Sequence, residues 1–342
     1  MVRLSICIAT YNRADVIAQT LESILPQLRE GVELLVVDGA SPDATESVVN
    51  SQFKGRIDCR YVRLPAKGGL DQDYCLAVEH AQGEYCWLMT DDDVLKPHAI
   101  NRVMEALQAN PDLLVVNAEV AGPDLKTILT ARLLKIKGNR EFGLSQGAEL
   151  LALAGSLLSF IGAVVVRRDV WLTRDPKPYL GSEFVHVGMI FQAPLERGAR
   201  LLAQPQVRIR YGRALWSPRA FEIWMFKWPQ LVWGLPAISD EAKKAVCPRN
   251  PWKRTVALAV MKAMGCYTLA EYRQWLKPLK LGTFTRLRLA GIAAFPDSLF
   301  NALMQMLLPL VIPGAKGTLL NLRQSRFDYR RRWPVLRNRK PS

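Results

Sequence analysis

Short apolar, partly β-branched runs recur along the first 120 residues, and each is followed by polar or glycine-containing sequence and then by a helix-like pattern. These runs occupy Leu4–Ala9 and residues 34–37, 58–64, 84–89 and 113–117. Strands that alternate with helices at this spacing predict an α/β fold, with a mostly parallel, doubly wound sheet flanked by helices. Residues 161–166 predict a further buried strand, and residues 183–197 an amphipathic helix interrupted near Pro194.

The distinctive polar and glycine residues lie directly after the apolar runs. They are Thr10, Tyr11, Asn12 and Arg13, then Asp38, Gly39 and Ser41, then Lys67, Gly68 and Gly69, and finally Asp91, Asp92 and Asp93. The carboxyl ends of parallel strands share one edge of a sheet, and open α/β sheets bind their ligands there. We therefore expect these four clusters to form one site. Ser41 is also expected to cap a helix that has Pro42 at its first position.

Three consecutive carboxylates, Asp91 to Asp93, end the fourth apolar run. Adjacent carboxylates repel one another, so a strand end that holds them needs a counter-charge, and a divalent cation supplies one economically. Mg²⁺ prefers oxygen ligands and usually shares its coordination shell with substrate phosphates. The alternative interpretation is a solvated acidic turn that caps a helix at Pro97.

Charge divides the chain unevenly. Residues 1–120 carry 10 Lys and Arg against 18 Asp and Glu, whereas the remainder carries 36 against 13. A basic surface suits nucleic acid, anionic lipid or a phosphorylated substrate. We predict an α/β domain over residues 1–212 and a helical, basic, aromatic-rich region over residues 213–342.

The C-terminal region combines aromatic, apolar and basic segments. Six Trp and Phe residues crowd into residues 216–233, Leu299–Ile312 is strongly apolar but too short to span a bilayer, and the tail from Gly317 carries eight Lys and Arg against one Asp. Such segments predict attachment to an anionic membrane surface. The alternative is a helical subdomain whose aromatic side chains fill its own core.

The N-terminal half resembles the family-2 glycosyltransferases, which have the nucleotide-sugar-binding GT-A fold. The resemblance is carried by residues 5–13, 35–43, 67–69, 83–85 and 90–93. Within that family, residues 67–93 are most similar to O-antigen sugar transferases of the abequosyltransferase type. Many members have an Arg-Asn pair where this chain has Tyr74-Cys75, with Asp71 and Asp73 nearby, so recognition of the donor sugar is expected to be specialised.

The resemblance implies roles for the strand-end residues in binding a nucleotide-sugar. The segment Thr10–Arg13 (Thr10, Tyr11, Asn12, Arg13) would wrap the base and diphosphate by main-chain contacts. Asp38, beside Gly39, would accept a hydrogen bond from the base or ribose. Lys67, Gly68 and Gly69 would approach the nucleotide and sugar, and Asp71 is expected to belong to the same site.

The acidic residues receive a metal role from the same resemblance. Asp91 would reach the ribose or the metal, Asp92 would ligate Mn²⁺ or Mg²⁺ that bridges the diphosphate, and Asp93 would assist. The cation would neutralise charge on the departing nucleoside diphosphate.

An inverting transfer needs a general base beside the acceptor hydroxyl. The resemblance places this base at Glu183, with His186 as the second candidate or as a third metal ligand. From the residues alone, a Glu in a first helical turn complements the helix dipole, and a single His is more often structural.

The resulting hypothesis is an inverting glycosyltransferase acting on a lipid-linked saccharide in bacterial surface polysaccharide synthesis, cytoplasmic and peripheral on the inner face of the inner membrane. Polyprenyl phosphate, a protein or a soluble sugar are alternative acceptors. A non-catalytic sugar-nucleotide-binding scaffold is a second hypothesis. A nucleic-acid-binding protein is a third, but it leaves the acidic triplet unexplained, and the sequence has no helix-turn-helix, zinc-finger or RRM signature.

Overall fold

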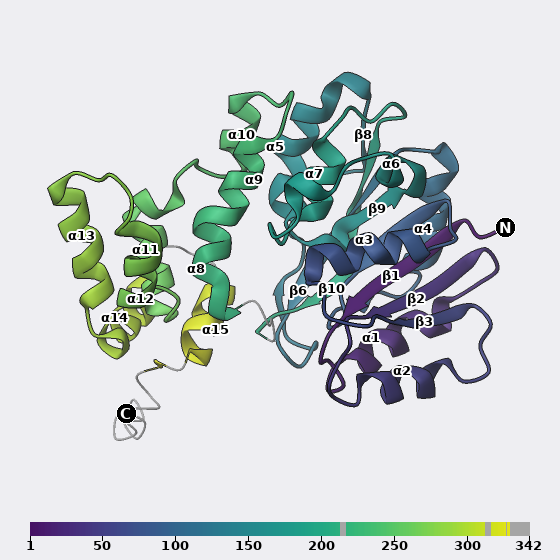
Figure 1. Cartoon of the computed structure of the whole chain (residues 1–342), viewed down its shortest axis with the longest axis horizontal. Helices are drawn as coiled ribbons and strands as arrows, with labels where there is room; N and C mark the ends of the chain where they lie inside the picture. The colour runs from purple at the N-terminus through teal and green to yellow at the C-terminus, as the bar shows by residue number, and fades with distance from the viewer. Residues whose placement is uncertain (213–216, 312–315, 326, 329–342) are drawn as a thin grey trace. The chain divides into compact units, whose positions relative to one another are not determined.

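A computed structural model describes the chain except for residues 213–216, 312–315, 326 and 329–342 (Figure 1). The chain divides into two compact units, Met1–Arg210 with Leu231–Pro248, and Tyr211–Gln230 with Arg249–Ser342. The segment 231–248 groups with the first unit because its helix α10 (Asp240–Val246) packs against α5 (Gly147–Leu158). Separate domains divided at residue 212 remain a prediction.

The first unit is built on a mixed, mostly parallel sheet. Its strand order is β3-β2-β1-β4-β9-β6-β10-β5, with β7 (Ile128–Thr130) paired to β6 and β8 (Arg140–Phe142) to β10. The strands of the main path are β1 Leu4–Thr10, β2 Val32–Asp38, β3 Cys59–Arg63, β4 Tyr85–Met89, β5 Val94–Leu95, β6 Leu113–Ala121, β9 Val164–Arg167 and β10 Ala199–Arg210. Strands β3, β2, β1 and β4 are parallel, whereas β9 runs antiparallel between β4 and β6. The predicted α/β fold class is confirmed.

Continuous apolar sequence explains why the central strands are buried on both faces. Every residue of β1, β2 and β4 is buried. Helix α3 (Leu70–His80) packs on β1 and β2, and it lies with α6 (Arg168–Leu172) on one side of the sheet, opposite α1 (Ile17–Ile24) and α2 (Thr45–Phe53) (Figure 1). Helix α4 (Ala99–Ala106) follows β5.

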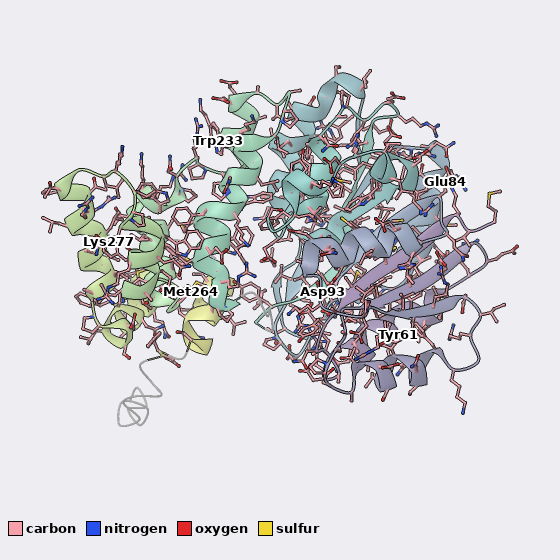
Figure 2. The ribbon with its side chains drawn as sticks, viewed as in Figure 1. Tyr61, Glu84, Asp93, Trp233, Met264 and Lys277 are labelled. Atoms are coloured by element: carbon pink, nitrogen blue, oxygen red, sulfur yellow. The ribbon has the colours of Figure 1, made fainter. Side chains whose placement is uncertain are left out.

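The register brings the strand ends to one edge. Thr10 pairs with Asp38, and Asp38 pairs with Arg63, so β1, β2 and β3 end level with one another. In Figure 2, Glu84 marks the start of β4 and Asp93 lies at the opposite end of the sheet. The loops after β1, β2 and β4 therefore meet at the same edge.

Two local predictions were wrong. Helix α2 begins at Thr45 rather than at Pro42, because the Ser41 hydroxyl accepts from the Asn12 amide instead of capping a helix. Helix α7 covers only Val185–Phe191, not residues 183–197. Glu183 has φ +71°, a left-handed conformation that is incompatible with a right-handed helix.

The second unit is helical. Its elements include α8 (Ala220–Glu222), the π-helices η7 (Ile223–Lys227) and η9 (Tyr272–Leu276), α11 (Thr255–Ala263), α12 (Leu269–Glu271), α13 (Thr283–Ala294), α14 (Asp297–Val311) and α15 (Lys316–Gln324). Helix α9 (Trp228–Gly234) has residues in both units. Aromatic rings fill its core, with Phe221 stacked on Tyr267 at 4.7 Å and Phe226 on Trp275 at 5.1 Å between ring centroids. This packing favours the subdomain interpretation for the described part of the aromatic cluster, while Trp216 lies outside the described residues.

No helix in the described part of the chain is long and apolar enough to cross a membrane.

Candidate active site

The loop after β1 is fastened to the loop after β2. The Asn12 amide donates to the Ser41 hydroxyl at 2.8 Å, and the Arg13 amide donates to the Thr45 hydroxyl at 2.9 Å. Asn12 itself has φ +59°, which Asn tolerates better than most residues. Because these two amides already have acceptors within the protein, they are not free to bind a diphosphate. Main-chain contacts from Thr10–Arg13 would have to use other groups.

Asp38 is fully buried, and the protein holds both of its carboxylate oxygens. The Tyr61 hydroxyl donates at 2.6 Å, the Ser41 amide donates at 2.8 Å, and the Arg63 guanidinium lies at 3.4 Å. Tyr61 lies on the neighbouring strand β3 (Figure 2). The contact of Asp38 with a base or ribose remains a prediction. It would require one of these partners to give up its contact with the carboxylate.

A buried carboxylate lies between the two glycine clusters. A Cβ atom at Gly39 or at Gly68 would lie 2.9 Å from an oxygen of Asp73, so glycine at both positions lets this carboxylate approach closely. Asp73 is only 4% exposed, and burial raises its pKa to about 6. Nearby, the Lys67 ammonium lies 3.7 Å from the centroid of the Tyr11 ring, within the range of a cation–π contact.

The sequence marked Asp73 only as part of a departure from the family pattern. Its place in the first turn of α3, four residues after Gly69, was the available signal. Gly69 has φ +98°, so the turn that brings α3 to this edge also requires glycine.

The acidic triplet has a counter-charge from the protein itself. The Arg13 guanidinium contacts Asp91 Oδ1 and Asp92 Oδ2, each at 3.1 Å, and all three side chains are nearly buried. Part of the counter-charge expected from the sequence therefore comes from Arg13. Arginine suits this position because its planar guanidinium can bridge two carboxylates.

Asp93 is directed into the protein. It accepts from the Thr90 hydroxyl and, at 2.7 Å, from the backbone amide of Arg210, whose Nε also donates to the carbonyl of Asp92 at 2.8 Å. Burial raises the pKa of Asp93 well above its usual value and that of Asp91 to about 7. Arg13 opposes this shift at Asp91.

Among the residues that the structure describes, no group of three or more His, Cys, Asp or Glu side chains is arranged to hold a metal ion. Asp93 is committed to Thr90 and Arg210, which leaves Asp91 and Asp92. Mg²⁺ is commonly held by one or two carboxylates together with substrate phosphates. Asp91 and Asp92 therefore fit a cation that arrives with a diphosphate, whereas they do not form a complete protein cage.

Asp71 anchors the segment that carries the proposed base. Its two carboxylate oxygens accept from the amides of Glu183 at 2.9 Å and Val185 at 3.0 Å, and burial raises its pKa. Because Asp71 lies in the first turn of α3, these bonds place Glu183 beside the glycine turn. A donor contact by Asp71 remains a prediction, since the structure already engages both oxygens.

His186 lies in the core. It is 1% exposed, its Nε2 lies 2.8 Å from the carbonyl oxygen of Leu158 on α5, and burial lowers its pKa to about 4. A neutral, buried imidazole held by a main-chain carbonyl is a structural residue. The geometry therefore gives no support to His186 as a base or a metal ligand.

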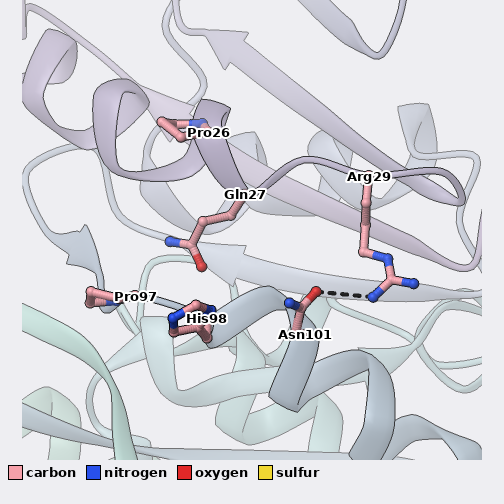
Figure 3. A pocket seen from close by; sticks show the side chains of 6 residues that line it. All are labelled: Pro26, Gln27, Arg29, Pro97, His98 and Asn101. Atoms are coloured by element: carbon pink, nitrogen blue, oxygen red, sulfur yellow. Dashed lines mark hydrogen bonds between the residues drawn. The ribbon is translucent and has the colours of Figure 1, made fainter.

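A surface hollow of about 570 Å³ lies elsewhere on the first unit. It is lined by Pro26, Gln27, Arg29, Pro97, His98 and Asn101, with Arg29 bonded to Asn101 at 3.0 Å (Figure 3). None of the predicted site residues lines it.

Residues 5–160 match the sequence model of the family described as Glycosyl transferase family 2. The abequosyltransferase RfbV of Salmonella typhimurium is 26% identical over 199 residues, which cover 54% of this chain and 59% of that protein. A GalNAc(5)-diNAcBac-PP-undecaprenol beta-1,3-glucosyltransferase of Campylobacter jejuni is 29% identical over 106 residues, which cover 31% of this chain and 34% of that protein. The chain thus spans less than two thirds of these relatives.

Solved structures agree on the fold. TarS 1–349 of S. aureus in complex with UDP has a TM-score of 0.56 at 15% identity, covering 97% of this chain and 92% of that one. The mannosyltransferase PcManGT of Pyrobaculum calidifontis, in complex with GDP-Man and Mn²⁺, has a TM-score of 0.52 at 16% identity, covering 97% and 87%. The fold is GT-A, and residues 5–160, which make up less than half of the chain, are similar to glycosyl transferase family 2.

Proposed function

We propose that this chain is an inverting glycosyltransferase that moves a sugar from a nucleotide-sugar donor to a lipid-linked saccharide. The observation that carries the proposal is the meeting of four strand-end clusters at one sheet edge, where Asp91 and Asp92 lie against Arg13. The neighbouring Lys67, Tyr11 and glycine turn offer a cation, a ring and close access to the backbone. A nucleoside diphosphate needs these three features.

Asp91 and Asp92 would hold Mn²⁺ or Mg²⁺ together with the diphosphate, and the ion would supply Lewis-acid stabilisation of the leaving group. Arg13 contacts the same two carboxylates and favours their ionised forms, which opposes the effect of burial on the pKa of each. Asp93 accepts hydrogen bonds from Thr90 and Arg210 and thereby fixes the turn that carries Asp91 and Asp92.

Glu183 would act as the general base. It would take the proton of the acceptor hydroxyl while the acceptor oxygen forms a bond to the anomeric carbon, and the bond from that carbon to the diphosphate breaks with its electron pair on the diphosphate. Asp71 fixes the backbone on either side of Glu183, so the carboxylate is carried on a positioned loop. The left-handed conformation of Glu183 is a strained feature of the kind that gathers at functional sites.

The Campylobacter relative favours a lipid-linked acceptor. The name of the Campylobacter relative states an undecaprenol-linked saccharide, and the Salmonella relative is an abequosyltransferase. We infer bacterial surface polysaccharide synthesis as the setting, with the chain cytoplasmic and peripheral on the inner membrane. An anionic membrane surface is then the third partner, beside donor and acceptor.

The proposal is tested by release of nucleoside diphosphate from a panel of UDP-, GDP-, CDP- and dTDP-sugars, with bacterial undecaprenyl-diphosphate saccharides as acceptors. One donor should support release that depends on the acceptor, and Asp92→Asn should lower the rate at least about a hundredfold. The matched control is Asp175→Asn, which changes an exposed carboxylate of the same unit. Equal rates in both variants would remove Asp92 from the reaction, and donor binding without turnover would support the scaffold hypothesis.

A further inference from the structure

Helix α14 has one face buried in the second unit. Ser298, Asn301 and Leu308 are at most 4% exposed, and the helix packs against α11 and α15. Asn301 donates to the carbonyl oxygens of Ala263 and Leu322, each at 2.9 Å. These polar bonds fix the rotation of α14 about its own axis.

Because the rotation is fixed, the other face of α14 presents a row of large apolar side chains to solvent. Leu299 is 47% exposed, Leu303 44%, Met306 62% and Leu310 78%. Their spacing of four, three and four residues places them along one stripe of the helix, and the half-exposed Leu307 lies beside it. Single exposed apolar residues are common on proteins, whereas a continuous stripe marks an interaction surface.

The preceding helix α13 continues this character. Phe284 is 88% exposed and Leu287 67%, three residues apart on one helical face, with the exposed Arg286 between them. The end of α13 meets α14 through Phe295 and Phe300, whose ring centroids lie 5.6 Å apart. Both helices of this pair therefore expose apolar side chains that the unit's own core does not use.

The charge of the unit indicates which partner can cover these side chains. Residues 249–342 carry 18 Lys and Arg against three Asp and Glu. One of these acids, Asp297, is paired with the buried Lys262 at 2.6 Å. A second copy of the unit would bring the same positive charge to the contact, which opposes self-association. An anionic lipid surface is complementary to both the apolar stripe and the basic charge.

We propose that the exposed stripe of α14, with Phe284 and Leu287 of α13, docks on an anionic lipid bilayer. The helix would lie in the plane of the interface with its apolar side chains in the headgroup region. The inference deepens the membrane partner of the proposed function, yet it requires neither donor nor turnover. It also narrows the attachment surface predicted from the sequence to the Leu-rich segment, α14, together with α13, because Phe221, Trp224 and Phe226 of the Trp-rich segment pack in the core of the unit.

The test is co-sedimentation of the full chain with vesicles of phosphatidylcholine alone and of phosphatidylcholine with 30% phosphatidylglycerol. We expect binding only to the anionic vesicles, and we expect Leu303→Gln with Met306→Gln to weaken it at least about tenfold. The matched control is Leu133→Gln with Leu172→Gln, which changes two leucines of the first unit that are 40% and 45% exposed. The control should bind like the unaltered chain, and equal thermal midpoints would show that both variants fold.

Three outcomes would overturn the proposal. They are equal binding by the α14 variant and the control, equal binding to both kinds of vesicle, and a dimer in light scattering that the α14 variant converts to a monomer. The last would assign the stripe to a second copy. Because vesicle binding is measured without donor or acceptor, its failure is distinct from a failure of the transferase proposal.

Discussion

Arg13 is the residue whose removal tests the electrostatics of the site most sharply. Its guanidinium lies 3.1 Å from oxygens of both Asp91 and Asp92, and the side-chain exposure of the three residues is 11–13%. Arg13→Gln keeps a polar side chain, but one that is shorter and uncharged, and it leaves two buried carboxylates without this counter-charge.

The expected decrease in the free energy of unfolding follows from the burial of these three side chains. Removing one partner of a buried ion pair costs about 3–5 kcal/mol, because an uncompensated charge remains. Protonation relieves part of this cost. The folded pKa of Asp91 is already about 7, above its unfolded value, so its contribution to stability is present at low pH and is lost as pH rises from about 4 through 7. Without Arg13 the folded pKa rises further, so the free energy of unfolding should fall by about 3 kcal/mol at pH 8 and by less at pH 5.5.

Urea unfolding followed by tryptophan fluorescence at these two pH values measures the loss. The matched control is Arg140→Gln, which breaks the Arg140–Glu149 pair, whose side chains are 53% and 50% exposed. That pair should contribute less than about 1 kcal/mol at either pH. In Arg13→Gln, Mn²⁺ in place of EDTA should restore part of the stability if Asp91 and Asp92 accept a cation. An Arg13 variant no less stable than the Arg140 variant would refute this account of the counter-charge.

Three further predictions concern individual side chains. Burial holds the folded pKa of His186 at about 4, below its unfolded value, so the free energy of unfolding decreases as pH falls from about 6.5 to 4. In urea titrations this decrease should be about 3 kcal/mol smaller in His186→Asn than in the unaltered chain. Equal decreases in the two proteins would contradict the buried neutral imidazole. Asp71→Asn should lower kcat about tenfold with little change in the donor KM, because an Asn amide keeps only one of the two acceptor oxygens that hold the loop at Glu183. Asp240→Asn, on a separate helix, should change neither constant. Donor affinity should weaken as pH falls through about 6, where Asp73 gains a proton, and Asp73→Asn should show a smaller dependence of affinity on pH. Calorimetric titrations that show the same pH profile in both proteins would exclude Asp73 from the donor site.

The sheet and its functional edge could be predicted because both signals are local. The strands are buried on both faces and read as unbroken apolar runs, and each run stops at a polar or glycine residue that marks its carboxyl end. Glycine pairs and an acidic triplet at those ends then indicated one site. The antiparallel insertion of β9 between β4 and β6 was not evident, since a short buried strand has the same pattern in either direction.

The contacts across that edge could not be predicted because they join residues far apart in the chain. Arg13 and Asp91 are 78 positions apart, and Asp71 and Glu183 are 112 apart. Ser41 satisfied the local rule for a helix cap, but the amide of Asn12 competed for its hydroxyl. His186 likewise shares a short motif with Glu183, yet the helix that begins at Val185 turns its imidazole toward Leu158.

Direct titration of the full chain with UDP, GDP, CDP and dTDP, in Mn²⁺ and in EDTA, tests the central claim most directly. We predict that one nucleoside diphosphate binds, that EDTA weakens its binding, and that Asp92→Asn abolishes the effect of Mn²⁺ while the protein stays folded. Binding of none of the four in either condition would contradict a nucleotide-sugar site at the ends of β1, β2 and β4.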